Sequence, residues 1–146
     1  MVVGITVVPP LIHVTKVPTP LLLSTEGGTV IYTNKVTNPG IEPLSNVRLT
    51  DDKCTPVNYI SGDANNDSKL DPAETWTYIC QTNLIKTTVN TITASGEDNG
   101  LIARDYAIAT VVVSTVTPTP DTVIPKLPNT GLYDYEQKFQ RAGYLN

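Results

Sequence analysis

The chain has 146 residues, enough for one domain of ordinary size, and only 16% of them are charged. Thr (22) and Val (16) dominate beside 12 Pro, 11 Asn and 9 Gly, a composition that favours strands and turns and excludes a helical bundle. The net charge is −4 and no cluster of Lys or Arg occurs, which excludes a phosphate-reading surface, so nucleic acid is not an expected partner.

Seven strand-like segments follow one another between turn signals, as in a β-sandwich or β-barrel. They are 11–17, 29–37, 44–52, 56–60, 74–82, 88–95 and 101–114. Period-two alternation places Val30 and Tyr32 on one face of the second segment, and Trp76, Tyr78 and Cys80 on one face of the fifth. The sequence therefore predicts an all-β, immunoglobulin-like antiparallel sandwich over residues 11–114, with Trp76 in its core.

The two ends of the chain differ from this domain. Residues 1–10 form an extended N-terminal segment. Its residues 2–8 are apolar on both faces, so we expect them to pair with a sheet edge of their own domain or of a neighbouring copy. Residues 115–126 are a Pro/Thr-rich spacer, and residues 127–146 are a short tail rich in aromatic residues. No run reaches the ~18 apolar residues of a spanning helix, so no transmembrane segment is expected.

The sharpest motif is the acidic loop 62–74. Counted from Asp63, oxygen-bearing side chains fall at positions 1, 3, 5, 9 and 12, the ligand order of an EF-hand loop. Ca²⁺ takes six to eight hard oxygens, which alternate residues of a tight loop can supply. The expected ligands of a structural Ca²⁺ are Asp63, Asn65, Asp67, Lys69 through its carbonyl, Asp71 and Glu74. The alternative is a solvated acidic turn.

One position of this loop departs from the EF-hand pattern. Ser68 stands where the pattern has Gly, and a left-handed Ser costs on the order of 1 kcal/mol, which weakens binding without abolishing it. Since the flanking segments are strand-like, the loop is expected to be a metal-stapled connection rather than a helix-loop-helix sensor. Cys54 and Cys80 stand before and after it, and residue chemistry alone leaves open a disulfide or two buried thiols.

Several segments together resemble a known family. They are LIHVTK, TVIYTNKVTNPG, LSNVRLTDDKC, SGDANNDSKLDPAETWTYIC, TVNTITASG and ATVVVS. Over residues 11–114 the chain resembles the immunoglobulin-like conserved-repeat modules of bacterial and archaeal surface proteins, with an EF-hand-like (dockerin-type) calcium loop. The resemblance implies an extracellular structural or adhesive module beside neighbouring repeat domains, without catalysis. In that setting it also implies a disulfide between Cys54 and Cys80.

A second resemblance concerns the start of the tail. Leu127, Pro128, Asn129, Thr130 and Gly131 match the LPxTG sorting signal of sortase substrates, which implies acylation at Thr130 and attachment to the cell wall. The residues that follow lack the apolar span and basic end of such a signal, so the alternatives are an exposed pentapeptide in a loop and a natural signal whose anchor was replaced.

Residues suited to catalysis are sparse. His13 is interpreted as a plain strand residue. Four acidic residues that could be considered as acid–base pairs are interpreted as solvated turn charges; these are Asp51, Asp52, Glu97 and Asp98. No nucleophile–base pair is evident, so the protein is not expected to be an enzyme. An isopeptide bond from Lys16 or Lys35 to Asn90 requires a lysine, an asparagine and a carboxylate buried together, and the sequence offers only candidates for these.

Two functions remain. The first is a calcium-stabilised structural module of a cell-surface protein. The second is a self-assembling subunit of an extracellular filament or pilus, which polymerises through its N-terminal and C-terminal segments.

Overall fold

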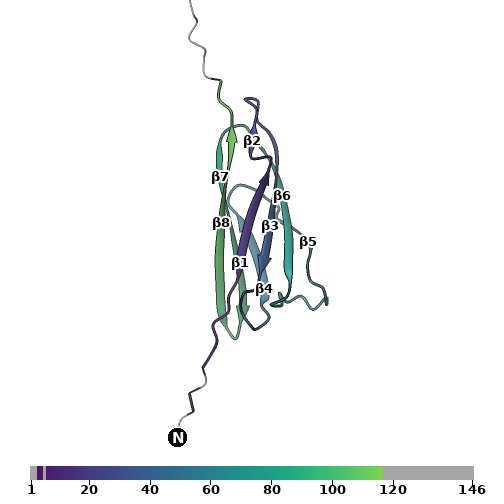
Figure 1. The fold of residues 1–146 in the computed structure, drawn as a ribbon, viewed down its shortest axis with the longest axis vertical. Coiled ribbons are helices and arrows are strands. Elements are labelled where there is room, and N and C mark those ends of the chain that lie inside the picture. The colour runs from purple at the N-terminus through teal and green to yellow at the C-terminus, as the bar shows by residue number, and fades with distance from the viewer. Residues whose placement is uncertain (1–2, 5, 117–146) are drawn as a thin grey trace, which may run out of the picture. The chain divides into compact units, whose positions relative to one another are not determined.

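The computed structural model describes residues 3–4 and 6–116, and this part of the chain is entirely β-structure and connecting loops (Figure 1). The strands are β1 (His13–Thr19), β2 (Leu22–Leu23), β3 (Gly28–Thr37), β4 (Ser45–Asp51), β5 (Asn58–Ser61), β6 (Thr75–Leu84), β7 (Thr88–Asp98) and β8 (Leu101–Val113). The described residues contain no helix that could cross a membrane.

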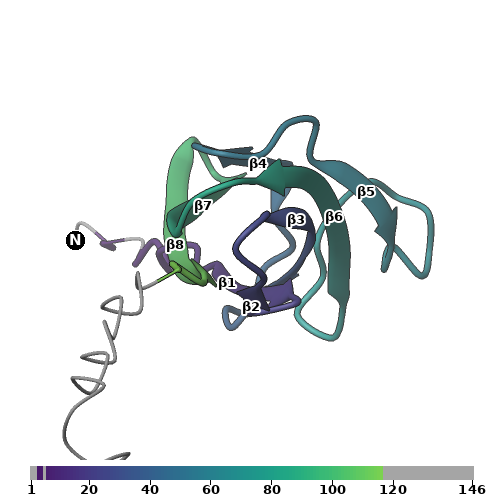
Figure 2. The same ribbon diagram turned by 90° about the horizontal axis from the view of Figure 1, so that it is seen from above.

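The strands form two four-stranded sheets, with the orders β1-β3-β6-β5 and β2-β8-β7-β4. Viewed along the strands, the sheets curve around a common interior, as in an immunoglobulin-like sandwich (Figure 2). Neighbouring strands are antiparallel except β2, which pairs in parallel with the end of β8. The all-β sandwich is confirmed.

The strand count differs from the expected seven because the structure adds β2. This strand is only two residues long, Leu22 and Leu23. The N–H of Val112 donates to the carbonyl of Leu21 just before it, and the N–H of Ser114 donates to the carbonyl of Leu23. A pair of residues carries no detectable period, so the sequence could not identify it.

Alternation of buried and exposed side chains in β3 and β6 builds the centre of the first sheet. The register sets Tyr32 opposite Cys80 and Val36 opposite Trp76, and all four side chains are buried. The other face of each strand is polar or partly exposed, which is why a period of two identified both segments.

The interior contains two hydrophobic clusters. One consists of Ile12, Val14, Val36, Leu44, Leu70, Trp76, Tyr78, Ile92, Ala94 and Ala103. The other consists of Leu23, Val30, Tyr32, Cys54, Cys80, Leu84, Ala109, Val111 and Val113. Along β3, Asn34 lies between a member of each cluster, and Lys16 and Asn90 are also buried. A layer of polar side chains therefore lies between the two halves of the core.

The chain enters and leaves this sandwich at opposite ends. In Figure 1, β1 and β8 run in the same direction, so the start of β1 at His13 and the end of β8 at Val113 lie at opposite ends of the sandwich. The described residues of the N-terminal segment form no strand, and Val3, Val7 and Val8 are exposed. Most of the expected spacer and all of the expected tail lie beyond residue 116, outside the described residues.

Candidate calcium loop

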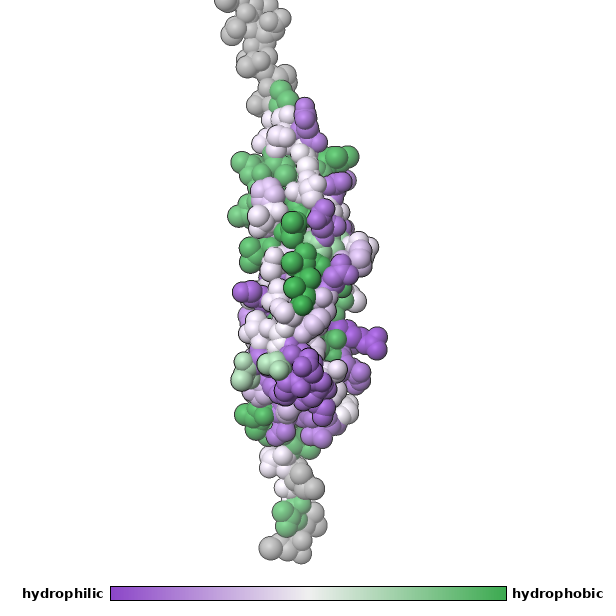
Figure 3. Space-filling model, turned by 90° about the vertical axis from the view of Figure 1, so that its right-hand side faces the viewer, coloured by the Kyte–Doolittle hydropathy of each residue, from purple (hydrophilic) through white to green (hydrophobic). Residues whose placement is uncertain are grey.

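The acidic loop connects β5 to β6 at one end of the sandwich, where hydrophilic side chains gather on the surface (Figure 3). Gly62 begins it with φ of 134°, and a Cβ at this position would collide with the carbonyl oxygen of Thr75. Only glycine lets the chain leave β5 so close to the start of β6.

The first half of the loop folds back on the carboxylate of Asp63. Its two oxygens accept the backbone N–H groups of Asp67 at 3.2 Å and of Ser68 at 2.9 Å. Asp67 in turn accepts the N–H of Lys69 at 2.9 Å. Ser68 has φ of 63°, so it adopts the left-handed backbone that the EF-hand pattern requires at this position.

Glu74 closes the loop from its other end. One oxygen accepts the N–H of Ala64 at 2.8 Å, and the other accepts the N–H of Asp71 at 3.2 Å and the indole N–H of Trp76 at 3.0 Å. Burial by itself would raise the pKa of Glu74, but the N–H donors outweigh it and hold this pKa below its usual value. The buried carboxylate is therefore fixed in its charged form.

Leu70 anchors the loop to the core. Leu70 and Leu44 are fully buried, and each donates its N–H to the carbonyl of the other, at 2.9 and 3.0 Å. Asn38 also donates its side-chain amide to the carbonyls of Leu70 at 3.0 Å and Glu42 at 2.7 Å. The apolar position of the motif thus joins the loop to the first core cluster.

The expected ligands share one short loop without forming a preformed metal cage. Asn65 donates its amide to Asp71 at 2.9 Å, and the described residues contain no group of three His, Cys, Asp or Glu side chains converging on a metal position. Each carboxylate oxygen has two lone pairs, so both oxygens of Asp63 and Oε1 of Glu74, which accept one N–H each, keep a second site for a cation. Oε2 of Glu74 accepts two N–H groups and keeps none. The donor set suits a hard cation such as Ca²⁺.

A disulfide joins Cys54 to Cys80, with an S–S distance of 2.00 Å and a Cα–Cα distance of 6.0 Å. The disulfide is confirmed, and the alternative of two free thiols is wrong. Both residues lie in the second core cluster, and Cys80 belongs to β6. The bridge therefore closes a chain segment that contains the whole acidic loop.

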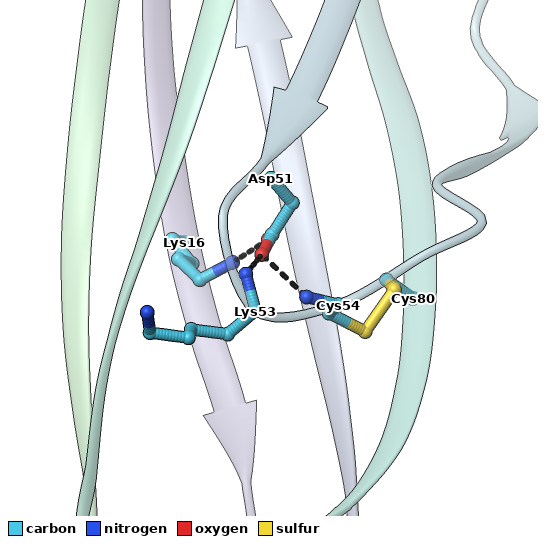
Figure 4. The surroundings of a disulfide bond; sticks show 5 residues. All are labelled: Lys16, Asp51, Lys53, Cys54 and Cys80. Carbon is cyan, nitrogen blue, oxygen red and sulfur yellow. Dashed lines mark hydrogen bonds and ion pairs between the residues drawn. A yellow bond between two sulfur atoms is a disulfide. The ribbon is translucent and has the colours of Figure 1, made fainter.

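The interpretation of Asp51 as a solvated turn charge is wrong. Its side chain is fully buried and pairs with Lys16 of β1 at 2.5 Å (Figure 4). The other oxygen of Asp51 accepts the N–H groups of Lys53 and Cys54, both at 2.9 Å. An Asp that accepts the N–H groups two and three residues further along is a common turn pattern, and the sequence indicated this part of the role of Asp51. No neighbouring residue indicated that its other oxygen faces the interior.

The other residues considered in the sequence lie outside the loop and, where described, at the surface or in strands. Asp52 is half exposed, and Lys35 is exposed on β3, so Lys35 cannot supply a buried amine. His13 lies on a strand as expected and also pairs with Asp105 of β8 at 3.0 Å. The sorting motif 127–131 lies outside the described residues.

The two sheets and the disulfide define an immunoglobulin-like β-sandwich module. No family model matches the chain, and no curated protein sequence matches it. A similar solved structure is native alpha-2-macroglobulin from Escherichia coli, spanning domain MG7 to the C-terminus, with a TM-score of 0.44 and 23% identity. The match covers 71% of this chain and 17% of that chain, so the chain spans less than a fifth of that neighbour.

Proposed function

We propose that this chain is an extracellular structural or adhesive module of a cell-surface protein, stabilised by one Ca²⁺ ion in the loop 62–74. The observation that supports the proposal is the conformation of that loop, in which the Asp63 carboxylate accepts the N–H of Ser68 and Ser68 has the left-handed backbone of EF-hand position 6. The buried disulfide supports an oxidising, extracellular location, because such bonds are rare in the cytosol.

The loop conformation also explains what the ion adds. Asp63, Asp67 and Asp71 bring negative charges together on a surface turn, and their repulsion opposes the folded conformation. A divalent cation removes this repulsion and joins the two ends of the loop through Asp63 and Glu74. Since the loop is anchored in the core at Leu70, ordering it supports both sheets.

Calcium-dependent melting tests the proposal. Extracellular modules bind Ca²⁺ with Kd of roughly 10⁻⁴–10⁻³ M. At about 10 mM Ca²⁺ the free energy of unfolding then rises by about 1.4–2.7 kcal/mol over the protein in excess chelator. For a domain of this size we expect the melting temperature to rise by about 6–20 °C.

Three controls sharpen this measurement. Asp63→Ala removes the calcium dependence, whereas Glu26→Gln, an exposed acidic residue outside the loop, keeps it. Mg²⁺ at the same concentration gives a much smaller shift, because it demands tighter octahedral geometry. Identical melting of the unaltered protein in calcium and in chelator contradicts the proposed site.

A second function is favoured by the N-terminal segment. Val3, Val7 and Val8 are exposed and outside any strand, although such a segment suits burial in a sheet. We propose as the alternative that this segment adds a strand to the sheet edge of another copy and so builds a filament. In sedimentation velocity with calcium present, the full chain then forms oligomers, and deletion of residues 1–10 leaves a monomer with unchanged calcium-dependent melting. A full chain that stays monomeric at high concentration excludes the filament.

A further inference from the structure

Four polar side chains are buried in the layer between the two hydrophobic clusters. They are Lys16 of β1, Asn34 of β3, Asp51 at the end of β4 and Asn90 of β7. Among the described residues, both amide atoms of Asn34 and both of Asn90 are buried without a hydrogen-bond partner. A buried unpaired polar group costs about 1–3 kcal/mol, so this layer requires an explanation.

Lys16 places a primary amine in this layer. Its Nζ lies 2.5 Å from Oδ2 of Asp51 and 4.2 Å from the ring centroid of Tyr32. Burial lowers the pKa of Lys16, and the hydrogen bond and charge of Asp51 only partly oppose this effect. The amine is therefore easier to deprotonate than an exposed lysine, and its proton has a carboxylate acceptor in contact.

Asn90 lies beside this pair. In the β4–β7 register Asp51 is opposite Ile92, and Asn90 is two residues along β7 on the same inward face. Asn90 is also near the hydroxyl of Tyr32, and the Lys16 amine lies over the ring of this tyrosine. The Lys16 amine thus contacts the Asp51 carboxylate and lies over the Tyr32 ring, and the unpaired carboxamide of Asn90 lies near the hydroxyl of the same tyrosine.

We propose that Nζ of Lys16 and Cγ of Asn90 become joined by an amide bond in the folded protein, with Asp51 as the proton carrier. Lys16 and Asn90 come from different sheets, so the bond joins the two halves of the sandwich through the core.

The reaction needs no external reagent. Lys16 passes a proton from Nζ to Asp51, and the neutral amine attacks the carbonyl carbon of Asn90. The new C–N bond forms, and the bond from Cγ to Nδ2 of Asn90 breaks. The leaving nitrogen takes one proton from the attacking amine to become ammonia, and the proton held by Asp51 converts it to ammonium. Asp51 returns to its carboxylate form.

The geometry selects Asn90 over Asn34. Asn34 is directly opposite Lys16 in the β1–β3 register, beside the base of the lysine side chain. The Lys16 amine lies at the far end of that side chain, against Asp51 of the other sheet. Asn90 belongs to that other sheet, two positions along the neighbouring strand from the residue opposite Asp51, so we infer that its carboxamide is the one within reach of the amine.

Mass spectrometry of the reduced, denatured full chain tests the proposal. We expect an intact mass below the sequence mass by one ammonia. We also expect trypsin to miss Lys16 and to release a branched peptide, in which residues 1–35 are joined to residues 87–104 through Lys16 and Asn90. The branched peptide is decisive, because succinimide formation at an asparagine also releases ammonia but joins no second peptide.

Five variants separate the roles of these residues. Lys16→Ala and Asn90→Ala abolish the branched peptide, while Lys35→Arg, which removes an exposed amine of β3 and keeps the tryptic site, retains it. Asn90→Asp forms the same amide bond with loss of water in place of ammonia, which keeps the test valid if an alanine variant does not fold. Linear peptides alone from the folded, unaltered chain overturn the proposal, and a branch that persists in Asn90→Ala but disappears in Asn34→Ala overturns the choice of Asn90.

Discussion

Removing the disulfide is the perturbation whose size follows most directly from the structure. Cys54 and Cys80 are 26 positions apart, so their bond closes a loop of 27 residues in the unfolded chain. In the chain-entropy model a loop of this length stabilises the folded protein by about 3.6 kcal/mol. We expect the double variant Cys54→Ala/Cys80→Ala to lose about this much free energy of unfolding.

The local structure indicates that the loss reaches at least this value. Both cysteines are almost fully buried in the cluster with Val30 and Tyr32, so the variant also loses packing around the removed sulfurs. The Asp51 carboxylate that accepts the N–H of Cys54 loses a fixed partner when that residue moves. Both effects act in the same direction as the loop entropy.

Equilibrium unfolding in guanidinium chloride measures the effect. With a typical slope of about 4 kcal/mol per molar, the midpoint falls by about 1 M. Reduction of the disulfide in the unaltered protein gives a second measurement of the stability that this bond contributes. A change below about 1 kcal/mol in both experiments refutes the reasoning, because the loop-closure term alone exceeds it.

Three further changes test other contacts. Leu70→Ala removes a fully buried anchor paired with Leu44, and we expect urea unfolding to show a loss of about 2–5 kcal/mol. Ser68 has a left-handed backbone with φ of 63°, which glycine adopts without strain. We therefore expect Ser68→Gly to raise the free energy of unfolding, measured by melting in chelator, by about 0.5–1 kcal/mol; a decrease contradicts the left-handed conformation of Ser68. Burial raises the pKa of Asp105, but its N–H donors and His13 outweigh this effect and lower it. A lowered pKa means that the contribution of Asp105 to stability is present above about pH 3.9 and lost as pH falls through the folded-state value. In the variant Asp105→Asn, the free energy of unfolding measured with urea therefore decreases less steeply as the pH falls from 6 to 2. The difference from the unaltered protein is less than about 1 kcal/mol because the side chain is 31% exposed.

The regular strands and the acidic loop were predictable because their signals are local. The buried face of β6, with Trp76 and Tyr78, follows from a period of two, and the loop follows from oxygen-bearing residues within 12 positions of Asp63. The conformation of Ser68 follows in the same way, since its position in the motif fixes the backbone that it must adopt.

The polar layer was not predictable because it depends on strand order. Asp51 stands in a turn-like Asp-Asp-Lys-Cys segment, and one of its oxygens does cap that turn. The other oxygen faces Lys16, which is 35 positions away, and only the packing of the two sheets brings them together. Asn90 has the same ambiguity, since a strand Asn is exposed or buried according to the face it occupies. Lys16, Asp51 and Asn90 could each be singled out in the sequence, but no local pattern links them.

The placement of the chain ends has a mechanical consequence. Because β1 and β8 enter and leave at opposite ends of the sandwich, a pull on its two ends loads these strands lengthwise (Figure 1). The proposed bond between Lys16 and Asn90 would carry that tension from β1 directly into β7. Residues 17–89 would then bear no load. Fully extended, these residues would span about 250 Å, and this length would not be released by a force that extends a domain without the bond. The module would lengthen under load only through the few residues before Lys16 and the β7–β8 hairpin.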